Sequence, residues 1–380
     1  MEPIYLDHAA TTPMHPNVIK AMQEVMGEVY GNPSSIHQFG RRARAILDEN
    51  RRYLAQSIGA DEKELYFTSG GTEADNLALI GVALANQHKG NHIITTAIEH
   101  HANIHAAEHL ESLGFEVTYL PVNEAGYVQP SDVVKQLRPD TILVSVMMIN
   151  NEVGTIQPIE EIANVLKDHQ AYFHTDAVQA YGLIKLDVKQ LGVDLMSASA
   201  HKLNGPKGVG FLYAQQDVKF NALQHGGNQE RLKRPGTESL PGIVGMRVAI
   251  EQIEANNYQN YDKYKLYRDL FYKELQQSGI EFSVNGKFEE LAPTILNISF
   301  ANTSVEQMLM SLDLEGVAVS SGSACTAGSI EASHVLTAMY GSDHPKTKNS
   351  IRFSFGFAND EAQMIEAAKR VINVVKRLTK

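Results

Sequence analysis

The sequence predicts an α/β fold with a large domain on a mostly parallel sheet and a smaller α+β domain. Between about residues 60 and 220, short apolar segments alternate with amphipathic ones, which is the pattern of a parallel sheet covered by helices. Beyond residue 244, long helical segments and a few strands replace this alternation. We expect residues 15–255 to form the large domain, and residues 1–14 and 256–380 to form the small one.

The expected elements follow from the apolar periodicity. Apolar runs predict seven strands in the first region, and apolar positions three and four residues apart predict the helices. The strands are expected within residues 64–71, 91–98, 115–122, 140–147, 171–178, 193–200 and 208–215 of the large domain, and within 294–300 and 350–356 of the small one. The helices are expected at residues 73–88 and 160–169, as one long helix over 244–278, and at the C-terminal segment 361–378.

The composition excludes several classes of protein. The chain has 380 residues, of which 43% are apolar, and a formal net charge of −11, which argues against a general nucleic-acid or anionic-membrane surface. The N-terminus lacks the pattern of a secretory signal, and the longest apolar run, residues 141–149, is too short to span a bilayer. Cys325 is the only cysteine, so neither a disulfide framework nor a cysteine-based zinc site is expected. These features predict a cytoplasmic protein.

Residues 68–76, TSGGTEADN, follow an expected strand and begin an expected helix. Gly70 and Gly71 permit close approach of the backbone, Thr72 offers a hydroxyl, and a helix N-terminus favours an anion. This pattern is typical of a phosphate-binding site. The alternative is a glycine turn in which Thr72 caps the helix and Glu73 occupies its first turn.

Two further polar groups follow expected strands. Asp176 ends one strand, where a buried carboxylate requires a cationic partner, although it could instead cap the next helix. Ser199, His201 and Lys202 follow another strand, where burial would lower the pKa of a lysine and suit it to imine formation. The alternative for Lys202 is an exposed surface position. Together with the phosphate site, these residues match pyridoxal phosphate, which needs an acid at its pyridine nitrogen and a lysine bound as an imine.

The segment 99–109 is rich in histidine. His101, His105 and His109 are four residues apart and could face a metal on one side of a helix, but exposed helical histidines are the favoured interpretation, so no metal site is predicted. His100 directly follows an expected strand and could stack on a cofactor ring.

Cys325 lies in SSGSACTAGS, residues 320–329, which offers no apolar partners. Such a segment favours a mobile, accessible and reactive thiol over a structural one, and an incidental surface cysteine is the alternative. Arg352 lies within an expected strand, where it could hold a carboxylate in two hydrogen bonds or form a structural ion pair.

These motifs, in this order, resemble those of cysteine desulfurases of the NifS/IscS type. The resemblance spans nearly the whole chain, through YLDHAATTP (5–13), GNPSSIHQFG (31–40), TSGGTEADN, NNEVG (150–154), HTDAVQA (174–180), SASAHKLNGPKG (197–208), RPGTES (234–239), SSGSACT and IRFSFG (351–356). It implies the aminotransferase fold type I, a homodimer, and conversion of L-cysteine to L-alanine with a persulfide left on the enzyme.

The resemblance also implies residue roles. Lys202 would bind pyridoxal phosphate as an imine and carry protons, Asp176 would pair with the pyridine nitrogen, His100 would stack on the ring and assist proton transfer, and Cys325 would be the nucleophile. Gln179 and Asn151 would contact the ring's phenolic oxygen and nearby groups. The phosphate would be held by Gly71, Thr72, Ser199, His201 and, from the partner subunit, Thr237. The substrate carboxylate would be held by Asn32 and Arg352, with Asn151 nearby.

Three departures from the family pattern accompany the resemblance. SAHK at residues 199–202 replaces the more usual SGHK, and FANDEAQ follows IRFSFG where relatives carry a different turn. The chain also ends soon after its last helix, whereas desulfurases that serve iron–sulfur assembly often carry a longer tail that engages the scaffold protein. The sulfur acceptor is therefore expected to be a tRNA-thiolation enzyme or an iron–sulfur scaffold, with the former favoured.

The sequence leaves two alternative functions open. A selenocysteine lyase or another fold-type I pyridoxal-phosphate enzyme would share the cofactor residues without depending on Cys325 in the same way. A non-enzymatic persulfide carrier would explain Cys325 but would leave Lys202, Asp176 and residues 68–72 without a role.

Overall fold

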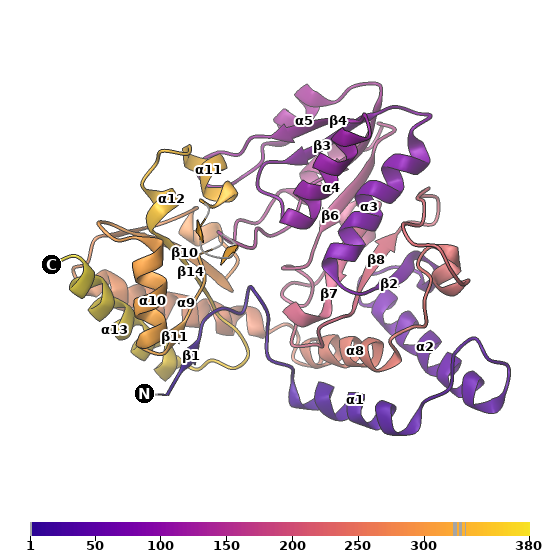
Figure 1. Cartoon of the computed structure of the whole chain (residues 1–380), viewed down its shortest axis with the longest axis horizontal. Coiled ribbons are helices and arrows are strands. Elements are labelled where there is room, and N and C mark those ends of the chain that lie inside the picture. Colours follow the sequence, from indigo (N-terminus) through magenta and orange to yellow (C-terminus); the bar gives the residue numbers. More distant parts are fainter. Residues whose placement is uncertain (1, 322–324, 327–328, 331) are drawn as a thin grey trace.

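The computed structural model contains a large sheet covered by helices, with a smaller group of strands and helices beside it (Figure 1). It describes residues 2–321 and 332–380, and between them only the backbone of residues 325–326 and 329–330. The predicted mobility of residues 320–329 therefore falls largely outside the described residues. Among the described residues, no helix combines the length and the apolar character needed to cross a membrane.

The large sheet has seven strands, and each lies within a segment in which the sequence predicts a strand. In spatial order they are β2 (Leu65–Thr68), β8 (Gly210–Ala214), β7 (Leu195–Ser199), β6 (Tyr172–Asp176), β5 (Thr141–Ser145), β3 (His92–Thr96) and β4 (Glu116–Leu120). The five strands from β7 to β4 are parallel, and β8 is antiparallel to both of its neighbours. The predicted mostly parallel sheet is confirmed.

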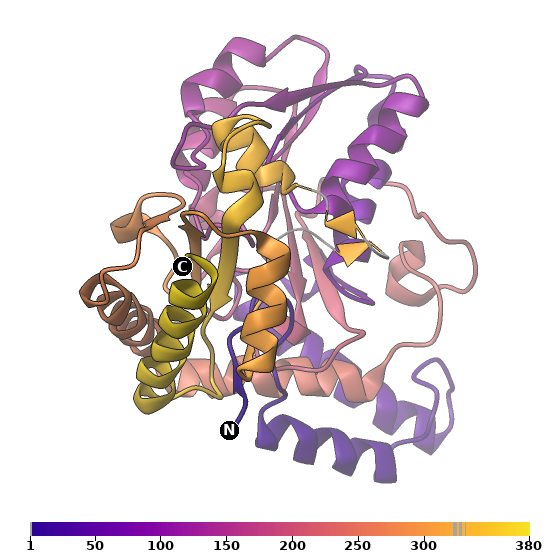
Figure 2. The ribbon, with the colours of Figure 1, turned by 60° about the vertical axis from the view of Figure 1, so that its left-hand side comes forward.

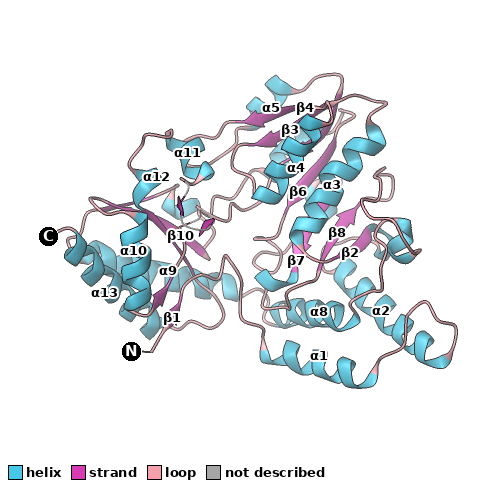
Figure 3. Cartoon of the chain, in the orientation of Figure 1, coloured by secondary structure: helices cyan, strands magenta, loops and turns pink. Residues whose placement is uncertain are grey.

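Alternating side chains of the strands supply two apolar cores, one on each face of the sheet. Ile93 and Leu143 belong to the core beneath α3 (Gly71–Asn86) and α4 (His101–Ser112). Their neighbours Ile94 and Val144 belong to the core on the other face. That second face is covered by α2 (Gln38–Gln56), α6 (Ile159–Leu166) and α8 (Leu240–Ala255), while α1 (Pro16–Glu28) packs on α8 (Figure 3).

The long helix predicted over residues 244–278 is wrong, because the structure has two helices there. α8 ends at Ala255, and α9 begins at Asn260 and runs to Gln277. Between them, Asn257 and Tyr258 have φ angles of +48° and +56°, in the left-handed region that ends a helix. The apolar periodicity continues on both sides of this break and neither Gly nor Pro marks it, so the pattern alone does not separate the two helices.

The smaller part of the molecule is built on a three-stranded antiparallel sheet. β10 (Ile295–Phe300) lies between β14 (Ser350–Ser354) and β9 (Phe282–Val284). The helices α9, α10 (Val305–Leu314) and α13 (Glu361–Leu378) pack together beside it (Figure 2). The N-terminal strand β1 (Ile4–Tyr5) pairs with β11 (Val317–Ala318) in this part of the molecule. The exact domain boundaries stay a prediction.

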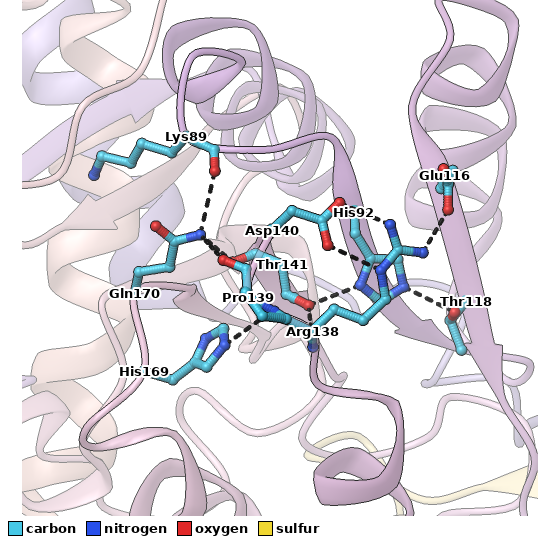
Figure 4. Close-up of polar contacts among 10 residues, drawn as sticks. All are labelled: Lys89, His92, Glu116, Thr118, Arg138, Pro139, Asp140, Thr141, His169 and Gln170. Carbon is cyan, nitrogen blue, oxygen red and sulfur yellow. Dashed lines mark hydrogen bonds and ion pairs between the residues drawn. The ribbon is translucent and has the colours of Figure 1, made fainter.

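Polar contacts hold the beginnings of three parallel strands together (Figure 4). The imidazole of His92, at the start of β3, is hydrogen-bonded to the hydroxyls of Thr141 on β5 (2.7 Å) and Thr118 on β4 (2.9 Å). Arg138, which precedes β5, pairs with Glu116 on β4. These contacts hold the strands together at their N-terminal ends. The polar groups predicted to bind a ligand follow the opposite, C-terminal ends, as expected in open parallel sheets.

Candidate active site

A cavity of about 380 Å³ opens where the C-terminal ends of the large-sheet strands meet the smaller part of the molecule. Ten of the predicted site residues line it, from six separate segments of the chain. They are Gly71, Thr72, His100, Asn151, Asp176, Gln179, Ser199, His201, Lys202 and Arg352. The sequence therefore predicts most of one continuous site, although these residues span 282 positions of the chain from the first to the last.

The N-terminus of α3 forms one end of the cavity. The N-cap residue of α3 is Gly70, whose φ is +152°, and no side chain caps the helix with a hydrogen bond. The alternative in which Thr72 caps this helix is therefore wrong. A Cβ placed on Gly71 would lie only 2.7 Å from Cγ2 of Val178, so glycine is needed for the helix to begin here. The open helix terminus, together with Thr72 and Ser199 on the cavity wall, fits a phosphate group.

Asp176 lies in the floor of the cavity at the end of β6. Its carboxylate accepts the backbone N–H of Val178 (2.8 Å), and none of the described basic side chains forms an ion pair with it. Burial raises the pKa of Asp176 to about 6, although the charge of Lys202 opposes this effect. A buried carboxylate of this kind fits the protonated nitrogen of a pyridine ring, which would supply the missing positive charge.

A second buried acid, Asp75 on α3, also lines the cavity and is not among the residues predicted from the sequence. Its Oδ1 has no hydrogen-bond partner and lies 3.7 Å from Nε2 of His174. His174 is hydrogen-bonded to the hydroxyls of Ser145 and Ser197, both at 2.9 Å, and burial lowers its pKa to about 3. Burial and then the nearby Asp176 raise the pKa of Asp75 well above its usual range. Burial beside Asp176 therefore favours the protonated form of Asp75.

Lys202 follows β7 and extends into the cavity. Its Nζ donates to the backbone carbonyls of Ala9 and Ala10, the latter at 2.7 Å. Burial, and then the positive charge of Arg352, lowers the pKa of the Lys202 amine to about 8, while Asp176 opposes the shift. About one amine in ten is then neutral at pH 7, far more than for a solvated lysine. The surface alternative for Lys202 is wrong, and the residue is suited to imine formation.

His100 is the N-cap of α4, and this role decides which ring nitrogen carries its proton. Nδ1 accepts the backbone N–H of Ala102 (3.1 Å), so the neutral ring carries its proton on Nε2. Burial, and then the charge of Lys202, lowers the pKa of His100 to about 4. The ring is therefore neutral at physiological pH and lines the cavity as a flat group with one N–H donor.

Two of the three histidines that follow His100 on α4 pack against each other. The ring of His101 stacks on that of His105 with centroids 5.3 Å apart and lies 4.7 Å from that of His334. Among the residues that the structure describes, no group of three or more His, Cys, Asp or Glu side chains could hold a metal ion. His101 and His334 instead belong to the cavity wall.

Arg352 is anchored in β14 and its side chain is only 6% exposed. Nη1 donates to the backbone carbonyl of Asn151 (2.9 Å) and Nη2 to the carboxylate of Asp7 (2.8 Å). The alternative prediction of a structural ion pair is therefore confirmed, with Asp7 as the partner of Arg352. Because Arg352 also lines the cavity, this pairing does not exclude the binding of a second carboxylate.

The segment that carries Cys325 is attached to the cavity walls at both ends. On one side, Ser320 and Arg352 exchange backbone hydrogen bonds of 2.7 and 3.3 Å. On the other, the hydroxyl of Ser333 donates to the buried carboxylate of Glu152, and Nε2 of His334 contacts the Glu99 carbonyl at 2.8 Å. Between them, the backbones of β12 (Cys325–Thr326) and β13 (Ser329–Ile330) pair antiparallel. The Cys325 side chain lies outside the described residues.

Two predicted site residues lie away from the cavity in the single chain. Asn32, between α1 and α2, is exposed, and its side-chain oxygen accepts the N–H of Ser34 (2.8 Å). Thr237 is also exposed, in the segment before α8. Neither residue lines the cavity with Lys202.

Comparisons with known proteins agree with this site. The aminotransferase class-V family model matches residues 4–366. An IscS-type relative from Bacillus subtilis (strain 168) is 55% identical over 379 residues and is covered completely, as is this chain. The cysteine desulfurase IscS of Dictyoglomus turgidum is 46% identical, with 99% of this chain and 96% of the relative covered. A solved NifS-like protein superposes with a TM-score of 0.91 at 34% identity, covering 99% of this chain and all of that one.

The chain therefore belongs to the class-V aminotransferase family, whose fold and cavity define an enzyme that depends on pyridoxal phosphate. Within this family it is a cysteine desulfurase of the IscS/NifS type, which acts on L-cysteine. The cavity fits the cofactor independently of this relationship, because an open helix N-terminus, an uncompensated buried carboxylate and a lysine with a lowered pKa meet in it.

Proposed function

We propose that different residues of the cavity bind the phosphate of the cofactor, its ring and the substrate. Gly71, Thr72, Ser199 and His201 hold the phosphate, Asp176 pairs with the pyridine nitrogen, and His100 stacks on the ring, near which Gln179 and Asn151 lie. The single observation that supports these roles is that one cavity brings together all eight residues and Lys202. When bound, pyridoxal phosphate supplies an electron sink that weakens the bonds at the α- and β-carbons of an amino acid.

The protein groups perform the remaining steps. Arg352 binds the α-carboxylate of L-cysteine, and Lys202, whose amine is partly neutral at pH 7, takes up the α-proton and later returns a proton to the product. His100 donates its Nε2 proton where negative charge develops. The Cys325 thiolate attacks the substrate sulfur, so that an S–S bond forms as the Cβ–S bond breaks, and the remaining three-carbon fragment leaves as L-alanine.

We propose further that the enzyme is a homodimer in which each subunit completes the other's cavity. Asn32 and Thr237 are exposed and lie away from the cavity of their own chain, yet their segments lie together, since Ser34 and Glu238 line one smaller cavity. Large apolar side chains flank Asn32 and are strongly exposed, which favours burial against another protein surface. They are Met26 (61%), Tyr30 (77%), Ile36 (90%) and Phe39 (53%).

Mixed dimers test this arrangement. A Lys202→Ala subunit and a Thr237→Ala subunit, each impaired as a homodimer at limiting pyridoxal phosphate, are expected to recover activity when they reassociate. If Thr237 acts across the interface, each mixed dimer has one intact site, and random reassociation gives about one quarter of the wild-type rate. The measurement is alanine formation before and after mixing.

A matched control uses Thr72, which lines the cavity of its own chain. Mixing Lys202→Ala with Thr72→Ala leaves a defect in every site and is expected to restore nothing. Equal recovery with Thr72→Ala and Thr237→Ala, or no recovery with Thr237→Ala, would contradict the contribution of Thr237 from the partner subunit.

The persulfide requires an acceptor with a reactive thiol, and we propose that this acceptor is a tRNA-thiolation enzyme or an iron–sulfur scaffold protein in the cytoplasm. An acceptor thiolate attacks the outer sulfur of the persulfide, and the Cys325 thiolate leaves. Enzyme charged with ³⁵S-labelled L-cysteine is expected to pass its label to the acceptor in a band that reductant removes. Each acceptor is tested in a separate reaction, with its cysteine-free variant as the control, and release of the label only as free sulfide in both reactions would oppose direct transfer.

A further inference from the structure

The turn formed by residues 7–11, between β1 and α1, contacts both the substrate end and the lysine end of the cavity. At one end, the Asp7 carboxylate accepts from Nη2 of Arg352 at 2.8 Å. At the other, the carbonyls of Ala9 and Ala10 accept from Nζ of Lys202. The turn thus joins two groups that β14 and the end of β7 bring from distant parts of the chain.

The turn is itself held in place by hydrogen bonds. The Ala10 N–H donates to the Asp7 carbonyl (3.1 Å), which also accepts from the hydroxyl of Tyr5 (3.0 Å). The Ala9 N–H donates to Oγ of Ser354, two residues after Arg352 on β14 (2.8 Å). The position of the Asp7 carboxylate is therefore coupled to that of the carbonyls that face Lys202.

Asp7 contacts Arg352 from outside the cavity. Arg352 lines the cavity and Asp7 does not, so Asp7 does not occupy the space available to a substrate. Asp7 and the Asn151 carbonyl together fix two of the guanidinium nitrogens, while Nε of Arg352 is buried and has no hydrogen-bond partner. The guanidinium is thus held in one orientation and retains a donor that is not satisfied within the protein.

Charge is balanced by the same contact. A guanidinium that is 6% exposed is costly without an anion, and Asp7 supplies one. Arg352 lowers the pKa of Lys202, whereas Asp7 and Asp176 raise it. His100 and His201 also face this amine, but their pKa values of about 4 leave them neutral. Removing the charge of Asp7 would therefore leave the Arg352 guanidinium without its anion and would lower the pKa of Lys202 further.

We propose that Asp7 is a positioning residue, which holds Arg352 ready for the substrate carboxylate and places the carbonyls that receive the Lys202 amine whenever it is not bonded to the cofactor. This inference rests on the proposed role of Arg352 in substrate binding. It assigns a function to the N-terminal YLDHAATTP motif, which holds the two ends of the site at a fixed separation.

The test is Asp7→Asn in the holoenzyme, which keeps the shape of the side chain and removes its charge. The KM for L-cysteine is expected to rise about tenfold or more with kcat changed less than about threefold, because binding of the carboxylate is lost while the reacting groups remain. The affinity for L-alanine, measured by the absorbance of the bound cofactor, is expected to fall by a similar factor. Without substrate, the midpoint of the pH titration of that absorbance is expected to move to lower pH, since a negative charge near Lys202 is lost.

Two further variants make the result decisive. Asp132→Asn removes the carboxylate of a surface ion pair with Lys135, away from the cavity and from the segments of Asn32 and Thr237, and is expected to match the wild type in every measurement. Asp7→Glu keeps the charge on a longer side chain, so it should keep the wild-type pH midpoint while the KM still rises. If Asp7→Asn does not fold, as judged by circular dichroism, Asp7→Glu alone carries the test.

The proposal is overturned if a folded Asp7→Asn enzyme matches Asp132→Asn in KM, in affinity for L-alanine and in pH midpoint. If Asp7→Asn does not fold, a wild-type KM in Asp7→Glu overturns it. Arg352→Lys separates this failure from failure of the proposed function. A raised KM in Arg352→Lys together with a wild-type KM in the Asp7 variants refutes only the role of Asp7, whereas a wild-type KM in Arg352→Lys refutes the carboxylate site itself.

Discussion

Lys202→Ala is expected to lower the rate of alanine formation from L-cysteine by about 10³-fold or more, with binding of pyridoxal phosphate retained. The substitution removes the covalent attachment and the proton carrier together, and positioned proton transfer alone contributes about 10² to 10⁴-fold. Most of the groups that fit the phosphate and the ring come from other segments, such as the start of α3 and the end of β6, so the variant would keep most of the residues that hold the cofactor. Alanine formation and the absorption spectrum measure the two effects.

Borohydride reduction locates the covalent bond directly. In the wild-type protein, reduction followed by peptide mapping is expected to place the cofactor on Lys202. Lys207→Ala, an exposed lysine five residues further on, serves as the matched control and should retain the wild-type spectrum and rate. A Lys202→Ala protein that still forms a reducible bond to the cofactor through another lysine, at near wild-type rate, would be incompatible with the role assigned to Lys202.

The parts of this site that the sequence predicts share one local property. Asp176 is the last residue of its apolar strand and Lys202 lies three residues after another apolar strand ends, so each strand carries its residue to the C-terminal ends of the sheet strands. Arg352 is inside a strand of the smaller sheet, and a charged residue within an apolar run is equally visible. Because a short segment of sequence sets each position, the pattern predicts the residue, its element and its cavity together.

The site residues that the sequence does not predict act through distant contacts or lie within a helical apolar pattern. Asp7 reaches Arg352 across 345 positions of the chain, and no local pattern indicates such a pair. Asp75 had a usable signal, because it lies four and seven positions before Leu79 and Val82, on the buried face of α3. An acid on an apolar stripe is costly to bury and therefore indicates a functional or paired group.

Positions that act from another chain carry no local signal in the sequence. Asn32 and Thr237 were predicted from family resemblance, and both are exposed here, away from the cavity. The sequence also predicted a single helix where Asn257 and Tyr258 separate two, because left-handed backbone at such residues depends on tertiary contacts rather than on apolar periodicity.

Cys325→Ala is expected to abolish sulfur transfer while the cofactor chemistry persists. The chain has no other cysteine, so the variant offers no thiolate to accept sulfur, and the rate of alanine formation should fall by about 10³-fold or more. L-cysteine should still change the absorption spectrum, because Lys202 and Arg352, which line the cavity, are unchanged in the variant. Intact-protein mass spectrometry should show an added sulfur atom in the wild-type protein after brief treatment with L-cysteine and none in the variant.

Two comparisons distinguish the desulfurase mechanism from its alternatives. Cys325→Ser keeps a small polar side chain but has no thiolate, and it is expected to be as inactive as Cys325→Ala, because a hydroxyl is a far weaker nucleophile at neutral pH. A selenocysteine lyase would keep its activity towards L-selenocysteine in both variants, and a non-enzymatic persulfide carrier would form no alanine even in the wild-type protein. Full retention of alanine and sulfide formation from L-cysteine in Cys325→Ala would show that sulfur leaves the substrate without this thiol, and the role of the segment between Ser320 and Ser333 would then have to be sought in binding rather than in sulfur transfer.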